Sequence, residues 1–203
     1  MTIRIGITGG IACGKSTISN WLKQWSYPVI DADAISRQVM GKNGQAFPIV
    51  VSEFSIDILD ESGEINRMKL AEMIFTDEKK RERLNEIVHP IIHKRMEELY
   101  QAYQNQGEKI VFFDIPLLFE GEMNISLDYV IVVAIRKDLQ VKRLVARNGY
   151  STAHALDRIH AQMPVEEKKK RADFVIDNEG SLENTEKQLK KVIDILQRSV
   201  FSS

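Results

Sequence analysis

The chain has 203 residues, 43% of them hydrophobic and 28% charged, which suits one compact domain with a small insertion. Its formal net charge of −1 gives no electrostatic reason to expect a nucleic acid or a membrane as partner, and no apolar run approaches the roughly 20 residues of a membrane helix. A single cysteine excludes an internal disulfide, and no secretory pattern opens the sequence, so we expect a cytoplasmic protein.

The first predicted element is a short buried strand over residues 2–8, rich in β-branched residues. The loop after it fits the template G-x-x-x-x-G-K-[ST] at Gly9, Gly14, Lys15 and Ser16. Apolar residues then recur at helical spacing from Ile18 to Trp25. Because a strand precedes the template and a helix follows it, we interpret the loop as phosphate-binding rather than as a glycine-rich turn that binds nothing.

In such a loop, the N–H groups of the backbone and of the first helical turn converge on phosphate oxygens. The expected contacts come from Gly9, Gly10, Ile11, Ala12, Cys13, Gly14, Lys15, Ser16 and Thr17. Lys15 would bring charge to the β- and γ-phosphates, and the Ser16 hydroxyl is the expected Mg²⁺ ligand. Cys13 lies near a helix N-terminus, where a thiolate is favoured, but a small residue filling the loop is the preferred interpretation.

A second short strand is predicted at Val29-Ile30, with Asp31 and Asp33 directly after it. Ligands of open parallel sheets gather outside the carboxyl ends of the strands, so one of these carboxylates is expected to meet an acceptor. We expect Asp33 to accept the proton of an attacking hydroxyl, while one of the pair caps the next helix. Which of the two contacts the acceptor stays open.

Residues 34–108 show helical patterns and no convincing strand, which indicates an inserted helical substrate domain by analogy with small-molecule kinases. Within the long helical stretch from Asp77 to Gln106, Pro90 is expected to begin a second helix or to kink the first. His89 and His93 are four residues apart, but the glutamate of H-E-x-x-H is absent, so a metalloprotease is excluded.

Three further strands are predicted at residues 109–114, 129–135 and 174–177, followed by a last amphipathic helix from Leu182 to Leu196. Alternating apolar strands and helices indicate an α/β fold with a parallel sheet covered on both faces. Asp114 ends the first of these strands, where a carboxylate can hold Mg²⁺ or its water shell; a turn-initiating aspartate is the alternative.

The segment between Arg136 and Arg171 carries ten basic and four acidic residues, whereas the rest of the chain is acidic. Arg143, Arg147 and Arg158 lie in a predicted helix–turn–helix, which suits a lid closing over a polyphosphate. The run Lys168–Arg171 is interpreted as a solvated helix face, and the lack of interleaved aromatics argues against nucleic acid.

Several segments together resemble the dephospho-coenzyme A kinase family. They are the loop Thr8–Ser16, Asp31-Ala32-Asp33, Leu84–Pro90 with its His-Pro, Asp114–Glu120 (Asp-x-Pro-Leu-Leu-Phe-Glu), Gln140–Leu144, Arg158–Gln162, Ala172-Asp173 and Asn178. The one visible departure is Ala12-Cys13, where many members have Gly-Ser or Ala-Ser. Because the similarity covers nearly the whole chain, it is far more specific than the phosphate loop alone.

The resemblance implies transfer of the ATP γ-phosphoryl group to the ribose 3′-hydroxyl of dephospho-coenzyme A, with Mg²⁺ required. It also implies a P-loop kinase fold with about five strands in three parts: a core (1–33, 109–135, 172–203), a helical substrate domain (34–108) and a lid (136–171). The implied catalytic residues are Asp33, Lys15 and Arg143, with Arg147 and Arg158 also on ATP and Ser16 and Asp114 serving the metal. The implied acceptor residues are Asp31, Asp33, Arg67, His89, Leu117 and Phe119.

Two alternatives remain at this point. One is a kinase for another small alcohol on the same scaffold, which only the His-Pro and Pro-Leu-Leu-Phe-Glu segments argue against. The other is a GTPase-like switch, which the absence of an Asn-Lys-x-Asp segment disfavours. The oligomeric state stays unknown.

Overall fold

The computed structural model describes residues 2–121 and 125–201. The chain divides into two compact units, Met1–Ile30 together with Tyr100–Ser203, and Asp31–Leu99.

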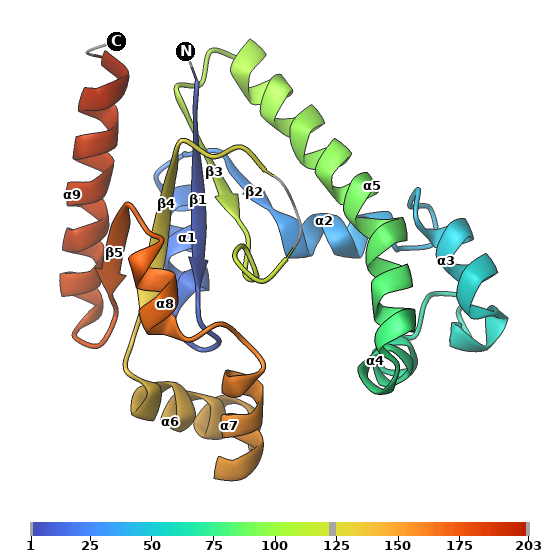
Figure 1. Ribbon diagram of the computed structural model, residues 1–203. Helices are drawn as coiled ribbons and strands as arrows, with labels where there is room; N and C mark the ends of the chain where they lie inside the picture. Colours follow the sequence, from blue (N-terminus) through green and yellow to red (C-terminus); the bar gives the residue numbers. More distant parts are fainter. Residues whose placement is uncertain (1, 122–124, 202–203) are drawn as a thin grey trace. The chain divides into compact units, whose positions relative to one another are not determined.

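The larger unit is built on a five-stranded sheet in the order β2-β3-β1-β4-β5 (Figure 1). The strands are β1 (Ile3–Gly9), β2 (Val29–Asp31), β3 (Ile110–Asp114), β4 (Tyr129–Ala134) and β5 (Phe174–Asp177). β1 pairs in parallel with both β3 and β4, and β4 pairs in parallel with β5. The expected α/β fold with about five parallel strands is therefore confirmed, with strand ends within a residue or two of those predicted.

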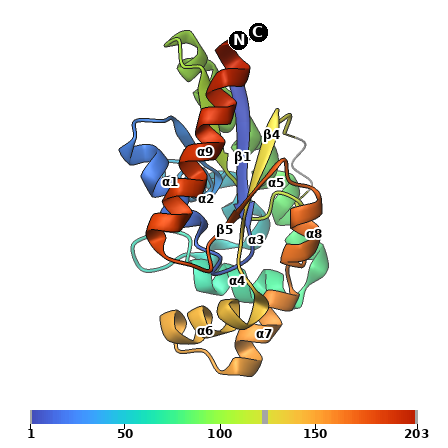
Figure 2. The same cartoon turned by 90° about the vertical axis from the view of Figure 1, so that its left-hand side faces the viewer.

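Every second residue of the strands points to one face of the sheet, and these residues form a core with α1 (Lys15–Gln24) and α9 (Leu182–Phe201). Figure 2 shows α1 and α9 to one side of β1 and α8 to the other. On the opposite face the Tyr100 ring packs on Phe113, with centroids 6.0 Å apart. Central strands covered on both faces must be apolar throughout, which explains why β3 reads Ile-Val-Phe-Phe before its terminal aspartate.

The basic segment folds as α6 (Lys137–Asn148), α7 (Thr152–His160) and α8 (Val165–Lys170). Gly149 ends α6 in the left-handed region, at φ 67°, where a side chain would be strained. The helix–turn–helix expected around Asn148-Gly149-Tyr150 is therefore present.

The unit Asp31–Leu99 is helical, as expected, and its only described β pairing is an isolated bridge between Leu59 and Ile65. Its elements are α2 (Ala32–Val39), α3 (Phe47–Phe54), the 3-10 turn η1 (Ile56–Ile58), α4 (Arg67–Thr76) and most of α5 (Glu78–Asn105). Of the two outcomes expected at Pro90, a second helix was wrong, because α5 runs without interruption through this exposed proline, whereas a kink stays a prediction. Buried positions on both sides of the proline, such as Leu84, Ile87, Ile92 and Met96, hold the helix together by packing.

Among the described residues no helix is long and apolar enough to cross a membrane.

Candidate active site

The loop between β1 and α1 has the backbone of a tight anion-binding turn. Gly14 lies in the left-handed region at φ 93°, and Ala12 also has a positive φ of 62°. A Cβ added at Gly10 would lie 2.6 Å from Gln140 Nε2 and 2.7 Å from Val165 Cγ2, so no larger residue fits there without displacing its neighbours. Neighbouring side chains therefore require glycine at this position, in addition to the turn itself.

Three polar side chains meet at the ends of β1 and β3. Parallel pairing places Ile7 opposite Asp114, so the strand-end carboxylate lies beside the start of the loop. Lys15 Nζ forms an ion pair with Asp114 Oδ1, and Ser19 Oγ donates to Oδ2 at 2.5 Å. Asp114 is only 4% exposed, so the Lys15 ammonium balances a charge that water barely reaches.

The outward carbonyls of the loop are held by donors from the later part of the chain. Gln140 Nε2 donates to the Ile11 carbonyl at 2.8 Å, and Asn178 Nδ2 donates to that of Cys13 at 2.8 Å. Arg143 Nη1 lies 3.5 Å from the Ala12 carbonyl, and its Nη2 donates to Asn178 O at 2.8 Å. These three side chains therefore hold the loop through its carbonyl groups.

Ile11 is held at both of its backbone polar groups. Its carbonyl accepts from Gln140, and its N–H donates to Gln162 Oε1 at 2.8 Å. Gln140 lies in α6 and Gln162 follows α7, so both ends of the helical pair are fastened to one loop residue. The basic helices and the loop therefore form one connected hydrogen-bonded structure.

Cys13 fills the interior of the loop. Its side chain is fully buried, and desolvation raises the pKa of the thiol above its ordinary value against the opposing effect of backbone hydrogen bonds from Ile135 and Gly10. A raised pKa disfavours the thiolate that proximity to a helix N-terminus suggested. The structure therefore supports the preferred interpretation, that Cys13 is a small residue filling the loop.

The three arginines expected near the phosphates differ in their contacts. Arg143 reaches the loop, as described above. Arg147 Nε donates to the adjacent Asn148 Oδ1, and Arg158 stacks over Tyr150 with its guanidinium 5.0 Å from the ring centroid. Both are described only in contacts within the helical pair.

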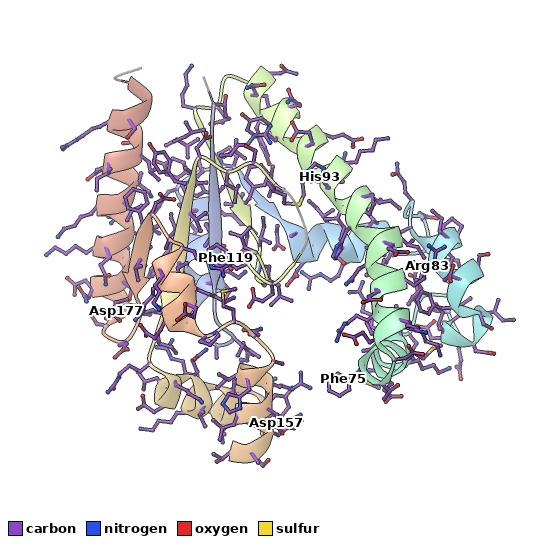
Figure 3. All side chains as sticks on the ribbon, viewed as in Figure 1. Phe75, Arg83, His93, Phe119, Asp157 and Asp177 are labelled. Carbon is purple, nitrogen blue, oxygen red and sulfur yellow. The ribbon has the colours of Figure 1, made fainter. Side chains whose placement is uncertain are left out.

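Two residues expected on the acceptor side follow β3 in the same unit. The Leu117 side chain is 46% exposed. Phe119 is half-buried, with the Arg171 guanidinium 5.7 Å from its ring centroid (Figure 3). Exposed apolar area of this kind is available for a ligand.

The remaining expected acceptor residues belong to the helical unit. Asp31 caps α2, its Oδ1 accepting from Ala34 N at 2.9 Å, whereas Asp33 lies exposed in the first turn of the same helix. Arg67 begins α4 and donates from Nη2 to the Arg37 carbonyl at 3.4 Å. His89 is half-buried and His93 lies further along α5 (Figure 3); no cluster of three metal-binding side chains occurs among the described residues.

Sequence reasoning missed most of the side chains that support the loop. Ser19 lies four residues after Lys15 on one helix face, a spacing that could have indicated its contact with Asp114. Gln140, Gln162 and Asn178 were noted only as parts of motifs. Lys168, interpreted as part of a solvated face, is fully buried and pairs with Glu120, so that interpretation was wrong for this residue.

A glycine-rich loop opening a helix, a lysine in its first turn and a carboxylate at the end of the neighbouring parallel strand define a P-loop nucleotide-binding protein, the class that includes the small-molecule P-loop kinases. The chain belongs to the dephospho-CoA kinase family, whose sequence model matches residues 3–184.

Known dephospho-CoA kinases match this chain over nearly their full length. A dephospho-CoA kinase of Listeria innocua is 47% identical over 190 residues, covering 94% of this chain and 95% of the relative. One of Bacillus cereus is 45% identical over 193 residues, covering 95% and 96%. The solved dephospho-CoA kinase from Campylobacter jejuni is 30% identical with a TM-score of 0.73, covering 98% and 99%. A shikimate kinase from Acinetobacter baumannii, 11% identical with a TM-score of 0.52, shares the fold alone.

Proposed function

We propose that the protein transfers the γ-phosphoryl group of ATP to the ribose 3′-hydroxyl of dephospho-CoA, giving CoA and ADP in the last step of CoA biosynthesis. The observation that carries this proposal is membership of the dephospho-CoA kinase family over residues 3–184, joined to a phosphate loop with Lys15 and Asp114 in contact.

For ATP, we assign the triphosphate to the loop Gly9–Thr17. The N–H groups of a helix's first turn favour anions. The Lys15 ammonium, which pairs with Asp114 in this structure, would also contact the transferring phosphoryl group. Arg143 would add positive charge from the outside of the loop, where it already contacts the Ala12 carbonyl. Preorganised donors of this kind stabilise charge that develops in the transition state.

For the metal, the donor set fits Mg²⁺ bound chiefly through phosphate oxygens and water. Ser16 is exposed in the first turn of α1, and both oxygens of Asp114 already accept from Lys15 and Ser19. This favours Ser16 as a ligand and Asp114 as a holder of the metal's water shell. When bound, Mg²⁺ would neutralise charge on the β- and γ-phosphates.

For the acceptor, we assign Asp33 as the base that takes the proton of the attacking hydroxyl. Arg67 and His89 would contact dephospho-CoA from the helical unit, and Leu117 and Phe119 would supply apolar surface. Asp31 would act indirectly, because its carboxylate is occupied in capping α2.

For the whole chain, we assign residues 1–33, 109–135 and 172–203 as the nucleotide core, 34–108 as the substrate domain and 136–171 as the lid. Arg147 and Arg158 would reach ATP by closure of the basic helices, which would also exclude water from the reaction. A cytoplasmic location suits this activity.

The test is ADP release with Mg-ATP and a panel of acceptors: dephospho-CoA, pantothenate, nucleosides, nucleoside monophosphates and shikimate. We expect turnover with dephospho-CoA alone and CoA as the product. Turnover with another acceptor and none with dephospho-CoA would contradict the proposed substrate while leaving the kinase fold in place.

A further inference from the structure

Lys168 differs from its neighbours in the basic run at the end of α8. Lys169 and Lys170 form exposed i,i+3 ion pairs with Glu166 and Glu167, each at 2.8 Å. The Lys168 side chain, on the same short helix, has 0% of its surface exposed. An ammonium leaves water at a high cost in free energy unless a partner compensates it, so this lysine is held by specific interactions that its neighbours lack.

The partner is Glu120, at the end of the segment after β3. Lys168 Nζ lies 2.7 Å from Glu120 Oε1, and the same oxygen accepts from Met163 N at 3.0 Å. The other oxygen, Oε2, is buried and has no hydrogen-bond partner in the part of the chain that the structure describes. The lysine therefore balances the charge of a half-buried carboxylate, and the carboxylate fixes where the ammonium lies.

The third group at this ammonium is the carbonyl of Gly9, the first glycine of the phosphate loop, 3.4 Å from Nζ. At this distance the interaction is largely that of a charge with the carbonyl dipole. The contact completes a set in which Gly9, Ile11 and Cys13 each offer a carbonyl to a side chain, respectively Lys168, Gln140 and Asn178.

Because of peptide geometry, these contacts to the loop carbonyls also determine which way the neighbouring loop N–H groups point. In a trans peptide the C=O of one residue and the N–H of the next point to opposite sides, and no cis peptide occurs among the described residues. Drawing the Gly9 carbonyl toward Lys168 therefore turns the Gly10 N–H away from it. Gln140 and Asn178 do the same for the N–H groups of Ala12 and Gly14.

We propose that Lys168 is a positioning residue for nucleotide binding. Anchored by Glu120, its ammonium holds the Gly9 carbonyl on the outside of the loop and thereby orients the first loop N–H toward the bound phosphates. Lys168 itself does not contact the nucleotide. The inference rests on the proposed function only in taking a nucleoside triphosphate as the ligand of the loop.

The experiment compares the wild type with Lys168→Met, the double variant Lys168→Met/Glu120→Gln and the matched control Lys169→Met. MgATP and inorganic tripolyphosphate affinities are measured by calorimetry, KM for each substrate by ADP release, and stability by urea unfolding. Lys168→Met alone should lower stability, because it leaves the half-buried Glu120 carboxylate without its cation. The second substitution removes that charge and should restore much of the loss.

The expected result is that the double variant still binds MgATP and tripolyphosphate about fivefold or more weakly, the scale of one lost hydrogen bond. KM for ATP should rise in step, whereas KM for dephospho-CoA should stay within about twofold, and Lys169→Met should match the wild type. Recovery of stability and phosphate affinity together in the double variant would overturn the proposal, since Lys168 would then only support the fold.

If both lysine variants fail to fold, Glu120→Gln alone decides the question, because it keeps the ammonium and removes its anchor. Weaker MgATP binding supports the positioning role, and unchanged binding overturns it. MgATP affinity needs no acceptor. A wild type that binds MgATP but does not phosphorylate dephospho-CoA would therefore refute the proposed function and leave this test valid.

Discussion

At the scale of single residues, Asp31 and Asp33 show how two nearby carboxylates take different tasks. Asp31 has an extended backbone, at φ −98° and ψ 109°, and accepts from Ala34 N, which is the geometry of a helix N-cap. Asp33 is the second residue of α2, within its first turn, and its side chain is exposed. The cap is thus occupied by the first aspartate, which leaves the second as the candidate base.

Replacing Asp31 should therefore change stability more than catalysis. We expect Asp31→Ala to lower the free energy of unfolding by about 1 kcal/mol, because the N–H of Ala34 loses its acceptor. Asp31→Ser keeps a capping oxygen and serves as the matched control. Urea unfolding and kcat measured on the same samples test this; a large fall in kcat for Asp31→Ser at unchanged stability would instead place Asp31 on the acceptor.

Replacing Asp33 should do the opposite. Asp33→Asn preserves size and polarity but cannot accept a proton, so we expect kcat to fall about a hundredfold or more with little change in stability. MgATP affinity, measured by calorimetry, should be retained. Wild-type turnover in this variant would remove Asp33 from the mechanism.

The buried thiol of Cys13 leads to a prediction about pH. Since the folded protein raises the pKa of this thiol, it binds the proton more tightly than the unfolded chain, whose thiol has the ordinary value of 9.0. The contribution to stability is complete below that value and is lost as the pH rises above it. We expect the stability of the wild type to fall more steeply above pH 9 than that of Cys13→Ala, measured by urea unfolding. Parallel curves would contradict burial of the thiol.

At the scale of elements, α5 keeps a proline inside a helix of 28 residues. An interior proline removes one backbone hydrogen bond and crowds the preceding turn. We expect Pro90→Ala to raise the free energy of unfolding by about 1–3 kcal/mol. Pro48→Ala is the control, because Pro48 lies in the first turn of α3, where proline is tolerated and no gain is expected. Equal effects at the two positions would show that the helix has relaxed around Pro90.

The strands and the phosphate loop could be predicted from the sequence because their signals are local. β5 was predicted at its observed bounds. The turn between the two basic helices was predicted from Gly149, which ends α6 in the left-handed region that favours glycine. The continuity of α5 through Pro90 was not predictable, because local preference argued for a break and packing of distant apolar residues decided otherwise.

The candidate site was predictable only where one residue type implies one role. Lys15 and Asp114, expected at adjacent strand ends, lie close enough to form an ion pair, although that pair itself was not predicted. The burial of Lys168 was not predictable, because a run of four basic residues indicates an exposed helix face. The partner that stabilises the buried ammonium, Glu120, lies far away in the sequence. Likewise, the contacts of Gln140 and Gln162 with Ile11 join residues more than a hundred positions apart, which no sequence spacing indicates.

At the scale of the whole molecule, the phosphate loop is held by side chains of its own unit, which are Gln140, Arg143, Gln162, Lys168 and Asn178. We therefore expect MgATP alone to slow hydrogen exchange at the loop amides and in residues 137–178. The exchange rates of amides in Asp31–Leu99 should change only when dephospho-CoA is added. Exchange followed by mass spectrometry tests this, and protection of the helical unit by MgATP alone would show that the two units respond to nucleotide together.

The sheet order also bears on how the protein is made. β1 precedes both of its neighbours, β3 and β4, by more than a hundred residues, and the loop after it is held by side chains up to Asn178. A growing chain thus displays the complete glycine-rich motif long before its support exists. We therefore expect nucleotide capture to follow synthesis of these later segments, and ATP to assist folding of the nascent chain only after residues 137–178 have left the ribosome.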